Sequence, residues 1–255
     1  MKNLAHLASL ATAIVITLCS SFSTASASDW GQFRGPEGNG VNTKAKLPVT
    51  WGEANIRWTA DVPGGGWSAP IQAGNKIFLT TAVSEEVGRP KGFGRGVASM
   101  GSFSRAKPPS EAVAFEIHCL NLEDGALLWK QVVESRKPKH KIHPSNTYAT
   151  ETPATDGQHV YVYFASIGVV ACFDLGGKEV WKREIGSFPS GNGFGTGSSL
   201  ALADGMVYIQ CDNDESSFLV AMDAKTGNDA WRVEREGRTS WSTPCLLYTS
   251  PSPRD

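Results

Sequence analysis

In this 255-residue chain, two histidines and one acidic turn have residue types and spacings that could bind a metal ion. His140 and His143 are three residues apart in a basic stretch, but a zinc site would need a third ligand at a suitable spacing. Residues 212–215 read Asp-Asn-Asp-Glu, a set of oxygen donors suited to calcium, without the spaced ligands of a dedicated calcium loop. A surface loop and a solvated turn are the favoured interpretations, so we predict no metal site and no catalytic residue.

The five cysteines do not form a disulfide framework. Cys119 and Cys172 each stand two positions before a predicted turn, where a third copy of the same phrase has Ala221. This placement predicts small buried residues on equivalent strands. We therefore expect free thiols here and at Cys211, near a strand end.

A basic insertion runs from Ser84 to Glu111 and is rich in Gly, Arg, Lys, Ser and Pro. A solvated, flexible loop is the favoured interpretation. The alternative is an arm that grips an anionic partner, such as a wall polymer or nucleic acid. The formal net charge of −1 gives no chain-wide attraction to nucleic acid, and we expect no nucleic-acid partner.

The elements that must position these residues repeat along the chain. The phrase Asn121–Lys130 (Asn-Leu-Glu-Asp-Gly-Ala-Leu-Leu-Trp-Lys) returns as Asp174–Lys182 and as Asp223–Arg232, about every 50 residues. In each copy a Gly, suited to the positive φ of a tight turn, precedes a Trp by four positions. A period near 50 filled with short β-type segments predicts an all-β propeller of four-stranded antiparallel blades. The Trp would lie on a last strand and pack against the neighbouring blade.

A second repeat opens each predicted blade with a strand, a Gly turn and a β-branched or aromatic strand. It covers residues 68–79 and 152–162, with a looser copy at 198–209 and the start of another at Ser242–Pro244. Ile56–Trp58 reads as one further last strand. The chain therefore holds about four blades, with an N-terminal helix belonging to a signal sequence.

The starts of innermost strands lie near the central channel of a propeller, and aromatic walls with a few polar groups suit a small-ligand pocket. Ser198-Ser199 and Ser242 stand at such starts, and Tyr148 and Thr196 lie on the loops leading in. The favoured alternative for any single residue is closure of a blade end. The residues proposed to bind a ligand or cofactor at this rim are Trp67, Glu151, Thr152, Asn192 and Trp241.

The Trp phrase, with Asp223, Gly227 and Trp231, resembles the tryptophan-docking repeat of pyrroloquinoline-quinone-like (PQQ-like) β-propellers. The opening Asp29-Trp-Gly-Gln-Phe-Arg-Gly-Pro-Glu-Gly-Asn-Gly40 is similar to the start of secreted bacterial members. The resemblance covers roughly residues 29–244 and implies a complete protein of seven or eight blades. The family includes quinoprotein dehydrogenases and a non-catalytic lipoprotein of the outer-membrane assembly machinery, so the repeat alone does not decide the chemistry.

Both ends of the chain fall outside the predicted repeats, which span residues 28–244. Residues 1–27 read as a cleaved signal peptide, with an apolar stretch from Leu7 to Leu18 and Ala25-Ser-Ala27 as the cleavage site. A lipid anchor at Cys19 is not favoured, because Leu18 before it is not small. Residues 245–255 contain two prolines that oppose sheet pairing and resemble translated sequencing-adapter sequence. We expect an exported fragment, periplasmic or extracellular, without a transmembrane segment and poorly stable alone.

Three functions follow from these observations. The preferred hypothesis is a non-catalytic binding or scaffold module for protein or cell-envelope polymer partners, with no cofactor. The alternative is a PQQ-dependent dehydrogenase with calcium, although the adjacent Cys pair of the resembled enzymes is absent from this sequence. The third is one domain of a glycan-handling enzyme whose catalytic module lies elsewhere.

Overall fold

The computed structural model describes residues 29–87 and 107–246. The predicted signal peptide, most of the basic insertion and most of the tail lie outside these ranges. Within them the regular secondary structure is almost entirely β-strand, with two single-turn 3₁₀ helices, η1 (Glu53–Asn55) and η3 (Gly191–Gly193). Neither helix has the length or apolarity of a membrane span.

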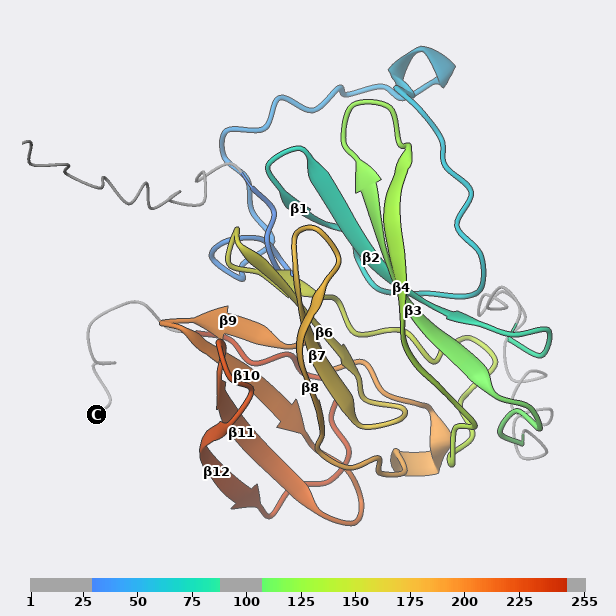
Figure 1. The fold of residues 1–255 in the computed structure, drawn as a ribbon, viewed down its shortest axis with the longest axis vertical. Coiled ribbons are helices and arrows are strands. Elements are labelled where there is room, and N and C mark those ends of the chain that lie inside the picture. Colours follow the sequence, from blue (N-terminus) through green and yellow to red (C-terminus); the bar gives the residue numbers. More distant parts are fainter. Residues whose placement is uncertain (1–28, 88–106, 247–255) are drawn as a thin grey trace, which may run out of the picture.

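The described strands form three four-stranded antiparallel sheets, each built from consecutive strands (Figure 1). The first contains β1 (Ile71–Ala73), β2 (Lys76–Val83), β3 (Val113–Asn121) and β4 (Leu127–Arg136). The second contains β5 (Ala154–Thr155), β6 (His159–Phe164), β7 (Val169–Asp174) and β8 (Glu179–Glu184). The third contains β9 (Ala201–Ala203), β10 (Met206–Cys211), β11 (Ser217–Asp223) and β12 (Asp229–Arg235).

The short first strands of the three sheets lie next to one another, and the later strands fan outward (Figure 1). This arrangement is that of successive blades around an axis and confirms the predicted all-β, incomplete propeller. Three of the roughly four expected blades are complete in the described residues. The prediction of a strand at Ile56–Trp58 is wrong, because this segment has no strand pairing, although its Trp58 contacts the first sheet as a blade tryptophan would.

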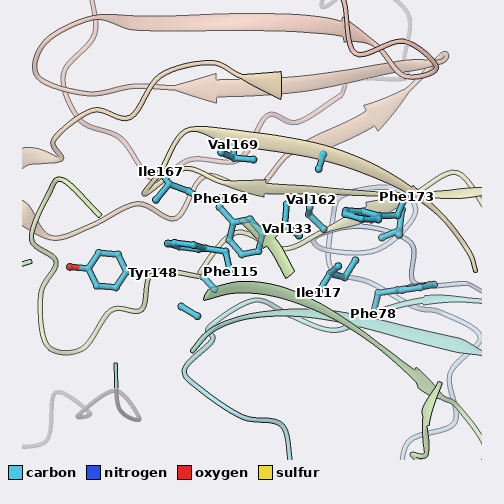
Figure 2. Close-up of a cluster of buried hydrophobic side chains, with 14 of the residues drawn as sticks. Phe78, Phe115, Ile117, Val133, Tyr148, Val162, Phe164, Ile167, Val169 and Phe173 are labelled. Atoms are coloured by element: carbon cyan, nitrogen blue, oxygen red, sulfur yellow. The ribbon is translucent and has the colours of Figure 1, made fainter. Parts of the chain in front are cut away.

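The central strands of the middle sheet, β6 and β7, are buried on both faces, and β6 shows why the sequence folds this way. Along β6, Val160, Val162 and Phe164 face the first sheet, while Tyr161 and Tyr163 face the third. Successive side chains of a strand point to opposite faces, so a central strand of a blade between two others needs apolar residues at nearly every position. Figure 2 shows the apolar interface between the first two sheets, where Phe115 meets Phe164 edge-on with ring centroids 5.2 Å apart.

The tryptophan phrase occupies the same place in each sheet. Trp129, Trp181 and Trp231 lie on β4, β8 and β12, and pair in register with Cys119, Cys172 and Ala221. A shift in register follows each of these three partners. The predicted equivalence of the two cysteines and Ala221 is confirmed, and both cysteines are buried free thiols.

The N-terminal segment Asp29–Gln32 crosses the innermost strands of all three sheets. It accepts one backbone amide from each, and Asp29 Oδ2 accepts a fourth from Gly74 at 2.9 Å. The segment therefore links the three blades at their inner edge. The three bonds run from the amides of Gln72, Thr155 and Leu202 to Trp30 O (2.9 Å), Gly31 O (2.8 Å) and Gln32 Oε1 (3.1 Å).

Candidate functional site

The candidate site is the inner rim, which we define as the residues immediately before β1, β5 and β9 (66–70, 149–153 and 196–200) together with the equivalent segment 240–244. The segments before β5 and β9 end the connections that lead from the outermost strand of one sheet to the innermost strand of the next, and segment 240–244 follows the outermost strand β12. Equivalent positions therefore recur at the same level of each blade. Ser, Thr and Glu make up half of these positions in the sequence.

A chain of hydrogen bonds links the rim from blade to blade. The amide of Ala69 donates to Thr152 Oγ1 at 3.1 Å, and the amide of Thr152 donates to Ser199 Oγ at 2.9 Å. The amide of Ser199 then donates to Thr243 Oγ1 at 3.0 Å. Thr152 and Ser199 are almost completely buried, and their hydroxyls accept from the part-buried amide of Ala69 and the buried amide of Thr152, respectively. The hydrogen bonds at Thr152 therefore join the first blade to the second and the second blade to the third.

Trp67 and Trp241 occupy the same rim position in the first sheet and in the segment after the third. Trp67 Nε1 donates to the Ser145 carbonyl at 2.7 Å, and Trp241 Nε1 donates to the Gly195 carbonyl at 2.8 Å. The residues are nevertheless 53% and 47% exposed. Each indole is thus fixed by its polar edge while part of its apolar surface meets solvent, as in binding sites that use rigid aromatic side chains.

The loops that lead into the rim hold one another through Asn146. Its Nδ2 donates to the carbonyls of Phe194 at 2.8 Å and Thr196 at 3.1 Å. His143 stacks on the Phe194 ring with centroids 5.3 Å apart, and Phe194 meets Trp241 edge-on at 6.2 Å. The two loops consequently present one fixed aromatic array beside the rim.

Glu151 is the least expected member of the predicted site, because it lies inside the protein rather than on the rim surface. The residue is 1% exposed, and burial raises the pKa of its carboxyl to about 7. Neither carboxylate oxygen has a hydrogen-bond partner among the described residues. The Tyr163 hydroxyl nearby is also buried without a partner there, and burial raises the pKa of that phenol well above its usual value.

Asn192 is not brought together with the other predicted site residues by any described contact. It is exposed in η3 and adopts the left-handed conformation (φ 55°, ψ 9°). Asn tolerates this conformation better than most residues, which accounts for its presence in this tight turn. Of the five predicted site residues, Glu151 and Thr152 are buried, Trp67 and Trp241 are part-exposed, and Asn192 is on a separate turn.

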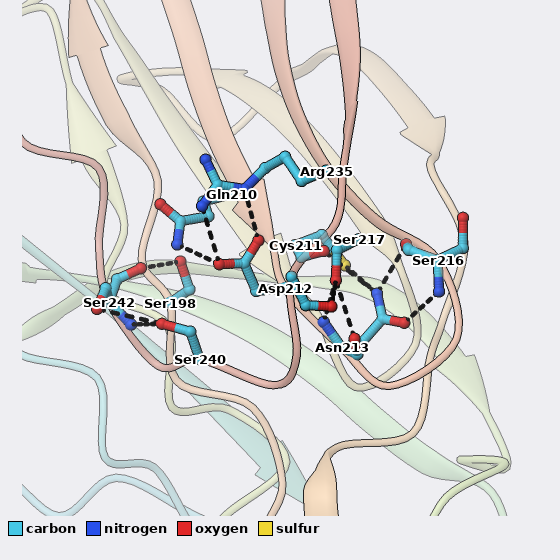
Figure 3. A network of polar contacts seen from close by, with 11 residues as sticks. Ser198, Gln210, Cys211, Asp212, Asn213, Ser216, Ser217, Arg235, Ser240 and Ser242 are labelled. Atoms are coloured by element: carbon cyan, nitrogen blue, oxygen red, sulfur yellow. Dashed lines mark hydrogen bonds and ion pairs between the residues drawn. The ribbon is translucent and has the colours of Figure 1, made fainter.

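The histidines and the acidic turn both take structural roles. His140 Nε2 lies 3.3 Å from the Ser187 carbonyl, and His143 Nδ1 lies 2.6 Å from Ser145 Oγ. In the acidic turn, Asp212 pairs with Arg235 at 2.9 Å, while Asn213 organises the turn backbone (Figure 3). The described residues contain no group of three or more His, Cys, Asp or Glu side chains that could hold a metal ion.

One polar cluster on the first sheet was not predicted from the sequence. On the first sheet, His118 Nε2 lies 3.0 Å from Glu116 Oε2 and 3.2 Å from Thr81 Oγ1, and Lys130 Nζ lies 3.3 Å from Glu116 Oε1. A catalytic triad would use the two different ring nitrogens for the carboxylate and the hydroxyl. Here both contact the same nitrogen, so the cluster is not arranged for nucleophilic catalysis. Burial lowers the pKa of His118.

Glu116 and His118 could have been grouped from the sequence, because residues two apart in a strand share a face. The contribution of Thr81 could not, since its pairing with Glu116 across the insertion depends on the register between β2 and β3.

Known proteins of two kinds are similar to this chain. The outer membrane protein assembly factor BamB of Moranella endobia is 26% identical over 192 residues, which are 69% of this chain and 46% of that protein. The chain thus spans less than half the length of this curated relative. A quinohemoprotein alcohol dehydrogenase from Comamonas testosteroni superposes with a TM-score of 0.48 at 16% identity, covering 83% of this chain and 28% of the enzyme. BamB from Moraxella catarrhalis gives a TM-score of 0.35 at 18% identity, covering 71% and 55%.

The family model described as outer membrane protein assembly factor BamB matches residues 113–249, which include β3 to β12 and both loops of the aromatic array. This match covers more than half of the chain and includes all three copies of the tryptophan phrase. The chain therefore belongs to this BamB-like family of PQQ-like repeat proteins.

Proposed function

We propose that this protein is an exported, non-catalytic binding or scaffold module that engages a protein or a cell-envelope polymer through the aromatic side of its inner rim. The observation that carries the proposal is that residues of the rim have two separate roles. Its buried hydroxyls at Thr152 and Ser199 are used to join blades, while Trp67 and Trp241 offer fixed indole surfaces to solvent. Such a surface is built for contact rather than for bond making.

Membership of the BamB-like family supports the same proposal, because the named relative is an assembly factor of the outer membrane. An exported location, periplasmic or extracellular, is consistent with the predicted signal peptide at residues 1–27 and is part of the proposal. The domain boundary at residue 28 and the assignment of residues 28–244 to the repeats are proposed on the same grounds. No cofactor is needed for this function.

Binding assays on the purified chain test the proposal. The partners are detergent-solubilised outer-membrane β-barrel protein and insoluble cell-envelope polysaccharide, measured by cross-linking and by co-sedimentation. The Trp67→Ala and Trp241→Ala variants should each weaken binding to the partner about 10-fold or more, as for a part-buried aromatic contact. Trp51→Ala is the matched control, since Trp51 is exposed away from the rim.

The proposal fails if Trp67→Ala and Trp241→Ala both bind as well as the wild type and the Trp51→Ala control, while all keep the wild-type melting temperature. It also fails if the chain, supplied with pyrroloquinoline quinone and calcium, reduces a dye at the expense of an alcohol or aldose. That second result would instead establish a quinone-dependent dehydrogenase.

A further inference from the structure

A cleft separates the N-terminal turn from the segment that follows the third sheet. Its volume is about 700 Å³. Residues within 32–38 line one side and residues 239–246 line the other, with Leu200 and Ala201 at the start of the third sheet. A volume of this size is typical of sites for small organic ligands rather than for single ions.

Arg34 lines the cleft from a turn that is held in place on several sides. Its backbone is left-handed (φ 63°), a conformation that costs an arginine free energy. The Gly35 amide donates to the Gln32 carbonyl at 2.9 Å, and the Gly40 amide donates to the Arg34 carbonyl at 2.8 Å. The Trp30 ring packs against Gly35. The turn therefore fixes the place from which the Arg34 side chain enters the cleft.

Arg34 and Glu37 are the two side chains of opposite charge in the cleft lining. The Arg34 guanidinium has five N–H donors and, within the part of the chain that the structure describes, only the Phe33 ring as a partner, at 5.5 Å. Glu37 Oε2 accepts from Asn39 Nδ2 at 3.0 Å, and the carboxylate has further capacity to accept. The cleft thus combines a group that only donates with a group that only accepts, and the two charges balance.

The opposite wall places one indole beside two hydroxyls. Trp241 is held through its Nε1 and is 47% exposed. The hydroxyls of Ser240 and Ser242 lie 3.2 Å apart (Figure 3). A hydroxyl both donates and accepts hydrogen bonds. This wall therefore offers an apolar plane together with groups that can bond to either kind of partner.

A saccharide ring matches this lining. Its C–H groups form an apolar face that suits an indole, and each of its hydroxyls both donates and accepts hydrogen bonds. An extended peptide would instead pair with the backbone of a strand edge. The inner edge of β9 is already engaged, because the Leu202 amide donates to Gln32 Oε1 at 3.1 Å. A charged polymer is disfavoured because the charges in the cleft balance.

We propose that the cleft binds a segment of an uncharged saccharide chain, with one ring stacked on Trp241 and its hydroxyls bonded to Arg34 and Glu37. The inference rests on the function proposed above, since it selects a polysaccharide among the possible partners and places it at one of the two rim tryptophans. Both walls lie within the predicted repeats at residues 28–244.

The test is isothermal titration of the full chain with four probes of similar length. They are cellotetraose and chitotetraose, which are neutral, tetragalacturonate, which is acidic, and a tetrapeptide of Ala and Ser. At least one neutral tetrasaccharide should bind, and it should bind more tightly than the acidic saccharide. The peptide should give no heat of binding.

Two variants place the bound saccharide in the cleft. Arg34→Asn keeps the turn, because Asn tolerates the left-handed conformation, and should weaken saccharide binding about 10-fold or more through lost charged hydrogen bonds. Trp241→Ala should weaken it by a similar factor. Arg57→Asn and Trp51→Ala are the matched controls, since both residues are exposed and outside the cleft lining. If Trp241→Ala does not fold, a crystal structure of the wild type with the tetrasaccharide locates the sugar directly.

Four results would overturn the inference. The first is that neither neutral tetrasaccharide binds at about 5 mM. The second is that both cleft variants bind the saccharide as well as the wild type, or that the crystal shows it outside the cleft. The third is tighter binding of tetragalacturonate or of the peptide. The fourth is binding to the outer-membrane β-barrel protein, weakened by the rim tryptophan variants, without binding to any saccharide. That last result would leave the proposed function standing and remove only the saccharide.

Discussion

The indole ring of Trp129 lies directly against Gly177 of the next blade, and its Nε1 donates to the Leu175 carbonyl at 3.1 Å. A β-carbon added at Gly177 would stand 2.7 Å from the ring. Two more tryptophans make the same contact with a glycine of a neighbouring turn. At each of these turns the backbone conformation and the lack of space for a β-carbon favour glycine. The other two sets are Trp58 with Gly125 and the Leu122 carbonyl, and Trp181 with Gly227 and the Ala224 carbonyl.

Replacing this glycine should separate the first two blades. Gly177→Ala places a methyl group against the Trp129 ring and also strains a backbone with φ of +90°. We expect a loss of about 2–4 kcal/mol in the free energy of unfolding, combining overpacking with the cost of a left-handed conformation. Urea unfolding followed by tryptophan fluorescence measures it.

Gly205→Ala is the matched control for this substitution. Gly205 has φ of +72°, and an added β-carbon would meet nothing within 4 Å. Its cost should be limited to the backbone, about 1–2 kcal/mol. Equal losses in the two variants would mean that the contact between Trp129 and Gly177 contributes nothing beyond backbone conformation.

Two tryptophans at equivalent positions should contribute very different amounts to the free energy of unfolding. Trp181 is 9% exposed and donates to the Ala224 carbonyl at 2.9 Å, whereas Trp231 is 42% exposed. Trp181→Ala should therefore cost about 3–5 kcal/mol of unfolding free energy, and Trp231→Ala no more than about 1 kcal/mol. Comparable losses would show that Trp231 is buried in solution, for example by a second copy, which analytical ultracentrifugation would detect.

The repeat made much of the fold predictable from the sequence. The spacing of Trp129, Trp181 and Trp231 predicted which strand of each sheet carries the indole, and the cysteines before two of the turns predicted equivalent buried positions on the preceding strands. The same reasoning failed at Ile56–Trp58, because similarity to a last strand does not provide a neighbouring strand to pair with.

The candidate site was less predictable. Its level within each blade followed from the strand starts, but the depth of Glu151 did not, because burial there depends on how closely the third blade approaches the second. Serines occupy the same position in the neighbouring blades, and a repeat alignment alone cannot tell a longer side chain that reaches solvent from one that is enclosed. The roles of Trp67 and Trp241 likewise depended on loops that precede different blades.

Acid should weaken the turn between β5 and β6 through Asp156. Burial alone would raise the pKa of this carboxyl, but hydrogen bonds from the His159 and Gln158 amides, at 2.6 and 2.8 Å, and from the Tyr161 hydroxyl, at 2.9 Å, outweigh burial and lower it. A carboxyl whose pKa is lower in the folded state stabilises the fold above its unfolded pKa, near 3.9, and loses that contribution as the pH falls through the folded value.

Asp156→Asn should therefore flatten the decline in stability below pH 4, since an amide cannot be protonated in this range. Urea midpoints measured from pH 6 to pH 2 would show the change in slope. Parallel curves for the variant and the wild type would indicate that Asp156 titrates alike in the folded and unfolded chains.

The hydroxyl of Thr152 should contribute more to the free energy of unfolding than its methyl group does. Thr152→Val keeps the shape of the side chain but removes the acceptor of the Ala69 amide, leaving a donor at the blade interface without its partner. We expect a loss of about 1–2 kcal/mol, in the lower part of the range for an unsatisfied buried group, because the Ala69 amide is part-buried. Thr152→Ser restores the acceptor and should lose only about 1 kcal/mol for the missing methyl.

Hydrogen exchange at the Ala69 amide should accelerate in Thr152→Val and remain slow in Thr152→Ser. If both variants exchange alike, the chain of rim bonds does not hold the first blade to the second, and the apolar interface around Phe115 and Phe164 is sufficient.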